Sequence, residues 1–396
     1  MRMDGLWVLF CFLPLFLAVY HITPEKEKKV TLLAGSIVYL FFFVLDGGWR
    51  AWSLIALIPA VYVAAYLRRP PVGLGLCFAV WSIYALGGMV PFWVRFLLLQ
   101  ASGVLLEVRR GWHPTGGLDH GISILMFPKL SYGPYVPPGE LAEQIAAPKV
   151  SWRRSREGLQ ELVIGFAGLV LLGGWIDQVV ATISVGMTAP GSWARVMLSA
   201  MSFYFRFAGA SAMAVGTGKL LGYELPEGFR QPWCAESVVD YFSRWNMSLW
   251  RWMDLLLGIS GKRGPQKALV LLIAGVVMGA WYGPGTQTLL WGIFIGVVMA
   301  TEQGSLKDWI GTHGVLARIY TLVMVLVGWG IFFVEEPAQL LRSVGGSVGS
   351  GVWWAVIVGA FFCSPIPSQW VERYRDKLWF DGALVLLFWV SLWFLV

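Results

Sequence analysis

The sequence predicts an all-α polytopic membrane protein, and three observations lead to that fold class. Hydrophobic residues make up 57% of the 396 residues and charged residues only 13%, which is about half the charged share of an ordinary soluble domain. Apolar stretches of the length needed to cross a bilayer recur along the chain. The 23 Trp and 13 Tyr suit many membrane crossings, because their rings favour the level of the lipid headgroups.

The apolar stretches predict roughly 10 to 12 tilted transmembrane helices, some of them short or broken. The first stretch resembles a signal-peptide core, but no small-residue cleavage site follows it, so we expect a retained first helix. The stretches are residues 6–20, 30–45, 51–67, 72–90, 92–106, 162–176, 194–216, 268–280, 286–300, 319–334, 352–362 and 382–396.

Charge in the short loops predicts an orientation. Basic residues follow the first, third and fifth stretches, so the positive-inside rule places these loops in the cytoplasm and the N-terminus outside. The same rule accounts for the net charge of +7 without a nucleic-acid partner. A further basic segment, with Arg153, Arg154 and Arg156, is expected to be a solvated cytoplasmic face that attracts anionic lipid.

Two segments in the middle of the chain, 117–160 and 217–265, mix apolar runs with Pro, Gly and charge. Irregular backbone survives at membrane depth only where it is buried in protein or lines a cavity, so interfacial and re-entrant helices are expected here. Asp119 and His120 form a pair without a third partner, and we expect a loop histidine. The four cysteines are far apart, which favours neither a disulfide framework nor a metal site.

Several common enzyme signatures are absent from the sequence: there is no Walker A motif, no GxGxxG after a strand and no HExxH. Instead, short patterns of Gly, Pro and aromatic residues follow one another in a fixed order. They are FPKL at 127–130 with Gly-Pro at 133–134, FRFAGA at 205–210, MAVG at 213–216, LGYELPEGF at 221–229, FSRWNMSL at 242–249, GAWYG at 279–283 with Trp-Gly at 291–292, and GWGIFF at 328–333.

This order and spacing resemble the membrane-bound O-acyltransferase (MBOAT) family, in particular its bacterial branch of alginate O-acetyltransferases and D-alanyl transfer proteins of teichoic acids. The resemblance covers the core at residues 117–335, and the flanking helices at 1–116 and 336–396 are alike only in hydropathy. We therefore expect a single integrated membrane domain made of these three stretches.

The resemblance implies a ring of tilted helices around a central tunnel, in a bacterial inner membrane. It implies that an acyl group arrives from a thioester donor or a carrier protein, and that the acceptor is a hydroxyl of a surface polysaccharide or lipid. No bound cofactor and no metal are expected. Membrane lipid and a periplasmic or membrane partner protein are the expected partners.

Two histidines of the family are replaced in this chain. The family's catalytic histidine stands in a Trp-His-Gly motif, where this chain has Trp281 followed by Tyr282. The second stands in an Arg-Trp-His-x-Ser-Leu segment, where Asn246 lies between Arg244 and Ser248. An imidazole has an ordinary pKa of about 6.5 and a phenol one of about 10, and an amide does not titrate. General-base catalysis of the family's kind is therefore not expected from these positions.

Two further polar positions differ from the family pattern. An acid has become Arg206, and Asp254 stands in the segment where the family has Trp-x-Arg-Asp-Tyr. A charge in an apolar run costs about 2.5–3.5 kcal/mol on insertion scales, so Arg206 is a candidate for function. It would bind an anionic ligand or a partner carboxylate. Alternatively, it reaches the interface or pairs with an acid such as Asp240 or Asp254.

The candidates for the tunnel or for binding are Arg206, Tyr282, Asn246, Arg244, Asp254, Ser248 and Trp281. No residue is predicted to be catalytic; Tyr282 is expected to pack as an aromatic plug, Asn246 to make structural hydrogen bonds, and His313 to lie in an interfacial loop.

These residues leave three hypotheses about function open. The first is a catalytically degenerate relative that acts as a binding or accessory subunit in the acylation of cell-envelope polysaccharide or lipid. The alternative is an active O-acyltransferase with rearranged catalytic groups. Transport through the tunnel is a third, and it rests on Arg206 alone.

Overall fold

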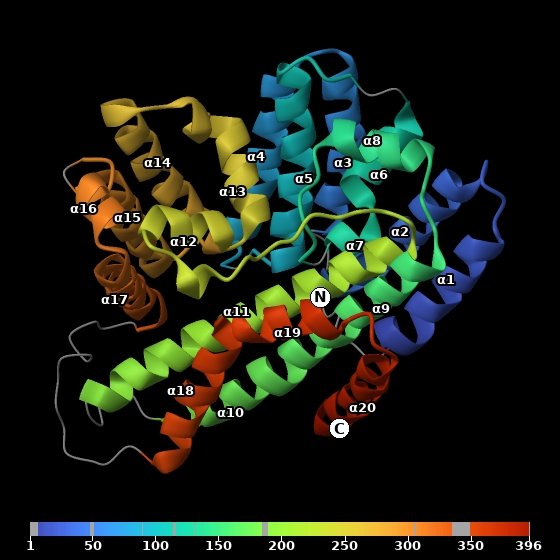
Figure 1. Ribbon diagram of the computed structural model, residues 1–396. Coiled ribbons are helices and arrows are strands. Elements are labelled where there is room, and N and C mark those ends of the chain that lie inside the picture. Colours follow the sequence, from blue (N-terminus) through green and yellow to red (C-terminus); the bar gives the residue numbers. More distant parts are fainter. Residues whose placement is uncertain are drawn as a thin grey trace. The chain divides into compact units, whose positions relative to one another are not determined.

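The computed structural model describes residues 7–47, 51–88, 90–113, 116–130, 132–183, 189–304, 306–334 and 349–395 (Figure 1). Of the described residues, 82% are helical and none lies in a strand, which confirms the all-α fold class. Contacts group the chain into two compact units, which we call unit 1 (1–162 and 210–227) and unit 2 (163–209 and 228–396). Two of the three borders between them fall inside helices, α9 and α11, and the third follows residue 227 in the segment after α11.

Unit 1 contains the N-terminal helices and the short helices of the first irregular segment. Its helix α5 is buried along nearly its whole length, because the other helices of the unit surround it. The elements are the π-helical η1 (Val8–Phe12), α1 (Leu13–Ile22), α2 (Lys28–Gly47), α3 (Ala51–Tyr66), α4 (Pro70–Leu86), α5 (Phe92–Arg109), α6 (Gly117–Leu125), α7 (Phe127–Leu130), α8 (Pro138–Ala146) and the first part of α9 (Trp152–Ala167).

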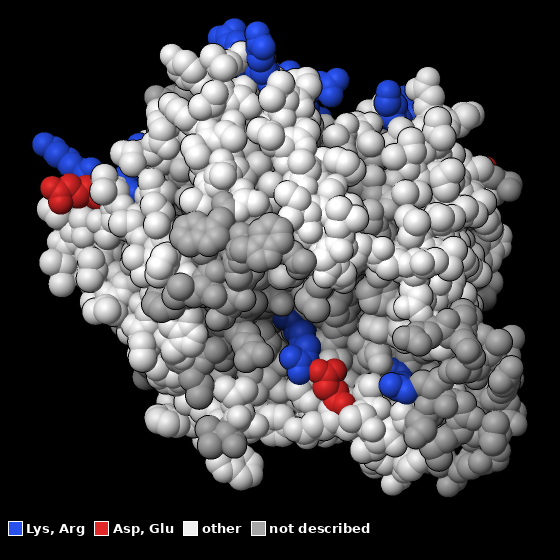
Figure 2. Space-filling view, turned by 180° about the vertical axis from the view of Figure 1, so that it is seen from behind, with Lys and Arg blue, Asp and Glu red and all other residues white. Residues whose placement is uncertain are grey.

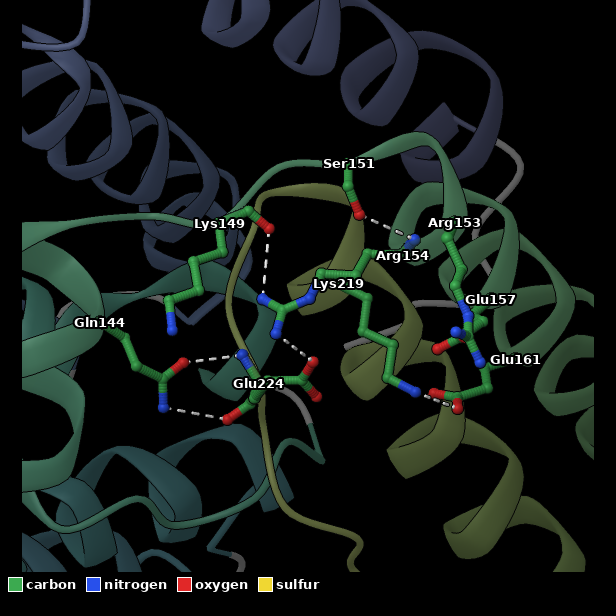
Figure 3. Close-up of polar contacts among 9 residues, drawn as sticks. All are labelled: Gln144, Lys149, Ser151, Arg153, Arg154, Glu157, Glu161, Lys219 and Glu224. Carbon is green, nitrogen blue, oxygen red and sulfur yellow. Dashed lines mark hydrogen bonds and ion pairs between the residues drawn. The ribbon is translucent and has the colours of Figure 1, made fainter.

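Polar contacts join the start of α9 to the segment that follows α11, within unit 1 (Figure 3). Arg154 pairs with Glu224 at 3.2 Å, and Lys219 pairs with Glu161 at 2.5 Å. Gln144 exchanges two hydrogen bonds with the backbone of Glu224, at 2.7 and 3.2 Å. The predicted basic face is therefore largely paired with acids, and Arg153 is the strongly exposed member, with 79% of its side chain accessible.

Unit 2 contains the long helices of the second half of the chain. Its elements are the π-helical η3 (Gly168–Gly174), α10 (Trp175–Ala181), α11 (Ala189–Leu220), the 3₁₀ turns η4 (Pro232–Cys234) and η5 (Ile259–Gly261), α12 (Val238–Arg244), α13 (Met247–Leu257), α14 (Gly264–Tyr282), α15 (Thr286–Thr301), α16 (Leu306–Thr312), α17 (Gly314–Phe333), α18 (Ser350–Cys363), α19 (Ile366–Tyr374) and α20 (Leu378–Leu395).

Helices α14 and α15 form a tight antiparallel pair in unit 2 (Figure 1). A Cβ added to Gly275 would lie 2.4 Å from the carbonyl oxygen of Gly292, and one added to Gly292 would lie 2.4 Å from that of Gly275. A Cβ on Gly279 would lie 2.5 Å from the carbonyl oxygen of Thr288. Small residues allow membrane helices to approach this closely, and the pair holds the end of α14 in a fixed place.

Length and hydropathy identify four helices in the described residues that could cross a membrane, or up to six if two bent pairs each count as one span. The four are Trp152–Ala181, which is α9, η3 and α10 together, and α14, α17 and α20. Helix α20 exposes large apolar side chains such as Trp393 and Leu386. Most of the surface in Figure 2 carries no charged side chain, as expected for contact with lipid.

The number of spans differs from the roughly 10 to 12 passes expected. Three further apolar helices are shorter than the length required, and α18 and α19 meet at a bend of 51°, so several apolar stretches form short or broken helices. The expected borders at 116 and 335 follow motif content rather than packing and stay a prediction; residue 335 lies outside the described residues. The ring and the central tunnel also stay predictions.

Candidate functional site

Tyr282 occupies the last turn of α14 and points into a group of rings in unit 2. Its hydroxyl accepts a 2.7 Å hydrogen bond from Nε1 of Trp245, and 4% of the residue is exposed. Its ring lies 5.3 Å from that of Trp291, edge to face, and 5.9 Å from that of Phe203. We call this group the aromatic cluster: Phe203, Tyr204, Phe229, Tyr241, Trp245, Tyr282, Trp291, Trp329, Phe332 and Phe333.

Trp245 reaches Tyr282 because the chain breaks between α12 and α13. The start of α12 is held by Glu302, whose carboxylate accepts hydrogen bonds from the backbone N–H groups of Val238 and Val239 at 2.7 and 3.0 Å. Trp245 ends α12 in an extended conformation and stacks on Tyr241 with ring centroids 5.6 Å apart. Because α12 is anchored in this way, the indole of Trp245 lies within hydrogen-bonding distance of the Tyr282 hydroxyl.

Asn246 follows directly and serves as the N-cap of α13. Its φ of 44° is in the left-handed region, where asparagine is one of the few residues tolerated. Its side-chain oxygen accepts from the backbone N–H of Leu249 at 3.3 Å, and 3% of the residue is exposed. Its Nδ2 is buried without a hydrogen-bond partner among the described residues. The amide oxygen is thus structural, while the amide nitrogen is an unused donor.

The other candidates lie around this pair in different ways. Trp281 packs edge to face on Tyr282 at 4.9 Å, and Ser248 is buried in the first turn of α13. Arg244 pairs with Asp240 at 2.8 Å, one turn earlier in α12. Asp254 lies about 12 Å along α13 from Asn246.

The Asp254 carboxylate accepts from the backbone N–H and the hydroxyl of Ser260 at 2.7 and 2.9 Å. The structure therefore brings Tyr282 and Trp281 together, gives Asn246 a capping role next to Trp245 in the chain, and directs Arg244 and Asp254 to local partners.

Arg206 pairs with an acid that the sequence did not single out. Its Nη2 lies 2.6 Å from Oδ2 of Asp177 on α10, whereas Asp240 and Asp254, the acids considered above, have the other partners just described. Ser202 contacts Oδ1 of Asp177 and lies 3.0 Å from the carbonyl oxygen of Gly173. In the sequence, Asp177 directly follows the apolar stretch at residues 162–176, and this position is the pattern that marks it as a possible partner.

Two titratable groups are buried in unit 1 on helices too short to span a membrane. His120 is a helical residue of α6 and 1% exposed, so the prediction of a loop histidine is wrong. The apolar face of α6 buries its ring against Tyr62, with centroids 5.0 Å apart, and leaves both ring nitrogens without partners among the described residues. Burial lowers the pKa of His120 to about 4.

Lys129 of the FPKL motif, on α7, is the second of these groups. It is fully buried and donates one hydrogen bond, 2.7 Å long, to the carbonyl oxygen of Ser123. Burial without an acid lowers the pKa of Lys129 to about 7, because the charged form is poorly solvated in an apolar interior. In the sequence, the FPKL motif indicates only the family resemblance, and nothing in it predicts that the amine of Lys129 is buried.

His313 lies just before α17, where it is exposed and stacks on Trp309 with centroids 5.3 Å apart. The chain has four histidines, at positions 21, 113, 120 and 313, and the aromatic cluster contains none of them. Within the described residues, the side chain of Tyr282 therefore lies among aromatic rings.

Comparison with known proteins supports the resemblance. No family model matches the chain. A probable alginate O-acetylase of Pseudomonas syringae is 24% identical over 387 residues, covering 87% of this chain and 74% of that protein. A peptidoglycan O-acetyltransferase of Helicobacter pylori is 22% identical over 427 residues, covering 94% of this chain and 78% of its own length.

A teichoic acid D-alanyltransferase of Bacillus subtilis is 24% identical over 269 residues, covering 60% of this chain and 67% of that protein. These relatives are named for O-acetyl or D-alanyl transfer involving alginate, peptidoglycan and teichoic acid, and their alignments cover 60% to 94% of this chain. The comparisons therefore indicate the membrane-bound O-acyltransferase family, as the motifs do.

Proposed function

We propose that this protein is a member of the family without histidine-based catalysis, acting as a binding or accessory subunit in the acylation of cell-envelope polysaccharide or lipid. The family and the names of the relatives point to acyl transfer in cell-envelope polysaccharide modification. The observation that carries the proposal is the environment of Tyr282, whose hydroxyl is enclosed by rings and held by Trp245.

The chemistry of the two positions supports this role. A general base accelerates acyl transfer by about 10²–10⁴ when its pKa lies near the operating pH. The phenol of Tyr282 accepts a hydrogen bond from an indole, and the oxygen of Asn246 is occupied by the backbone of α13. Neither group is set up to remove a proton from an alcohol.

An active O-acyltransferase is the second candidate, and one observation favours it. The Nδ2 of Asn246 is a buried donor without a partner among the described residues, and a thioester carbonyl oxygen would satisfy it. Such a donor would stabilise the oxyanion that forms during acyl transfer. The proton would then be taken by a group other than Tyr282.

The expected partners follow from the proposed role. They are an acyl thioester donor or carrier protein, a periplasmic or membrane partner protein, and membrane lipid. The proposed location is the bacterial inner membrane, where a lipid-facing chain of this kind meets both a cytoplasmic donor and an external acceptor.

The test combines cells and purified protein. In cells that lack the gene, envelope O-acylation is measured after return of the wild-type chain, Tyr282→Phe, or the double variant Tyr282→His with Asn246→His. An accessory subunit predicts that acylation falls without the gene and that Tyr282→Phe restores it fully. In purified form, the wild type and Tyr282→Phe are expected to transfer no acyl group from a thioester donor.

Tyr282→Phe is the matched control, because it keeps the ring and removes only the hydroxyl. Thioester turnover by the purified wild type that exceeds that of the double histidine variant would contradict the proposal. Turnover that survives Tyr282→Phe but is lost in Asn246→Ala would favour the active transferase instead.

A further inference from the structure

An ion pair outside the aromatic cluster joins α10, the last part of the candidate span Trp152–Ala181, to α11 in unit 2. Arg206 and Asp177 meet at 2.6 Å, and their side chains are 44% and 45% exposed. Charged residues within membrane spans are rare and usually mark a functional site, because each is expensive to insert. Half exposure means that the pair is open on one side rather than sealed in the core.

The site is shaped to hold the pair. A Cβ on Gly173 would lie 2.7 Å from Cγ of Arg206, so glycine leaves room for the arginine stem to lie across the helix. The 2% exposed Ser202 contacts Oδ1 of Asp177 and fixes the carboxylate. Arginine alone on a lipid-facing helix would reach for the interface, but here it is turned toward an acid that a third side chain orients.

The position along the helix points to the outside of the membrane. The span Trp152–Ala181 has 30 residues, and Asp177 lies four residues from its end. The opposite end carries Arg153, Arg154 and Arg156, which the positive-inside rule places in the cytoplasm. The distance from Arg153 to Asp177 is about 36 Å along an α-helix, which is enough to cross the hydrocarbon layer. The pair therefore lies near the external face.

The opposite charges of Arg206 and Asp177 indicate which kind of ligand the pair can bind. Arg206 is neutralised by Asp177, and no second acid of the described residues lies within ion-pair distance of the guanidinium. An anion would have to compete with Asp177 for the same donors. An alcohol instead donates to the carboxylate and accepts from the remaining guanidinium N–H groups, so the pair offers both halves of a hydroxyl's hydrogen bonding.

The pair also lies close to the aromatic cluster along α11. Arg206 is one helical turn from Phe203, whose ring is 5.9 Å from that of Tyr282 and 6.0 Å from that of Trp245. Residues at this spacing lie on neighbouring parts of one helix surface. A chain of hydroxyl groups held at Arg206 would therefore lie about one turn from the site where the family resemblance places the acyl transfer.

We propose that Asp177 and Arg206, with Ser202 as a positioning residue, bind the neutral hydroxyl groups of a sugar chain at the external end of this helix. The inference rests on the proposed function, since it assigns the polysaccharide acceptor a place on this chain. It differs from an anion site and from a lipid headgroup contact in the charge of the ligand, and the experiment separates these.

The experiment measures binding to the full chain in nanodiscs of neutral phospholipid. Cellohexaose is the neutral hydroxyl probe and inorganic phosphate the anionic one, both followed by titration calorimetry. Asp177→Asn and Arg206→Lys are each expected to weaken cellohexaose binding about tenfold, because a hydrogen bond to a charged group is lost or misplaced. Melting temperatures of all variants are recorded with the binding data.

Glu236→Gln is the matched control. It breaks the ion pair with Arg318, which is 2.8 Å long and about half exposed in the same unit, and it is expected to leave cellohexaose binding unchanged. Equal binding by the wild type and both site variants would overturn the proposal, as would an absence of cellohexaose binding by a folded wild type. Phosphate binding that Arg206→Lys weakens, with cellohexaose unaffected, would also overturn it and assign an anionic ligand.

The failure of this inference is distinguishable from that of the proposed function. If deletion of the gene leaves envelope acylation unchanged while Asp177→Asn weakens cellohexaose binding, the hydroxyl site stands and the accessory role falls. If acylation depends on the gene while both site variants bind cellohexaose as the wild type does, only the hydroxyl site falls.

Discussion

The two units bury polar side chains in different surroundings. In unit 2, the hydroxyl of Tyr282 has Trp245 as a partner and lies among rings. In unit 1, Lys129 has a single carbonyl partner and His120 has unpartnered ring nitrogens. Unit 2 therefore has a site of packed and hydrogen-bonded rings, while unit 1 holds two groups whose pKa burial lowers. A motif match alone does not say which of these two outcomes a position will have.

The largest expected effect comes from disrupting the packing of α14 against α15, which holds the end of α14 in unit 2. Gly292→Leu places side-chain atoms where the backbone of Gly275 lies, 2.4 Å from the new Cβ, and neither backbone can move. We expect a loss of about 3 kcal/mol or more, seen as loss of folded protein in size-exclusion chromatography. Gly285→Ala is the control, because nothing lies within 4 Å of a Cβ there. Normal yield of Gly292→Leu would show that the helix pair is looser than described.

The next effect tests the buried lysine of unit 1. Between the folded pKa of about 7 and the ordinary value of 10.5, the unfolded chain holds a proton that the folded protein does not. The linkage relation then makes stability rise with pH across this window. Lys129→Met is expected to melt at a higher temperature at pH 7 and to lose the rise between pH 7 and pH 10. The exposed Lys149→Met is the control, and an unchanged pH profile for Lys129→Met contradicts the assignment.

A smaller effect sharpens the account of the unit 2 site. Tyr282→Phe removes the acceptor of Trp245 and leaves a buried indole N–H unsatisfied, which costs about 1–3 kcal/mol. Trp245→Phe with Tyr282→Phe removes both partners, so the double variant should be less destabilised than the sum of the singles. Thermal unfolding in detergent measures all three. Strict additivity would mean that the hydrogen bond contributes nothing.

The smallest effect concerns the surface of unit 1. Arg153 pairs with Glu157 at 3.1 Å, but 79% of its side chain is exposed. Arg153→Ala should therefore change the free energy of unfolding by less than about 0.5 kcal/mol. This small difference between the variant and the wild type should hold at low and at high salt concentration. Lys219→Met breaks the more buried pair with Glu161 and should be the more damaging of the two. The reverse order would contradict the burial described for this network.

The fold class and several helices could be predicted from apolar patterning. The stretch at 268–280 lies inside α14 (Gly264–Tyr282), and that at 194–216 lies inside α11 (Ala189–Leu220). The apolar stretch within the span Trp152–Ala181 begins only at residue 162, because the first turns of this helix are rich in arginine and glutamate. Bends, such as that between α18 and α19, depend on packing that hydropathy does not record.

Motifs in the sequence predicted which positions belong to the candidate site, but they did not predict the partners of the side chains at those positions. The spacing of the motifs marked Tyr282 and Asn246, but the partner of Tyr282 comes from the break between α12 and α13. The pair of Arg206 with Asp177 depends on the rotation of α10 against α11, which no local pattern encodes. The buried state of Lys129 depends in the same way on the helices that surround α7.

The π-helical segment η3 (Gly168–Gly174) lies just before Asp177. A π-helical stretch contains one residue more than the α-helix it interrupts, and each residue advances an α-helix by about a quarter turn or slightly more. Deletion of Leu171 would therefore restore a regular α-helix and leave Asp177 on the side of its arginine. An aligned relative that lacks one residue in this stretch would accordingly share the ion pair if it kept both charged side chains, whereas loss of one residue from the α-helical part of this span would separate them.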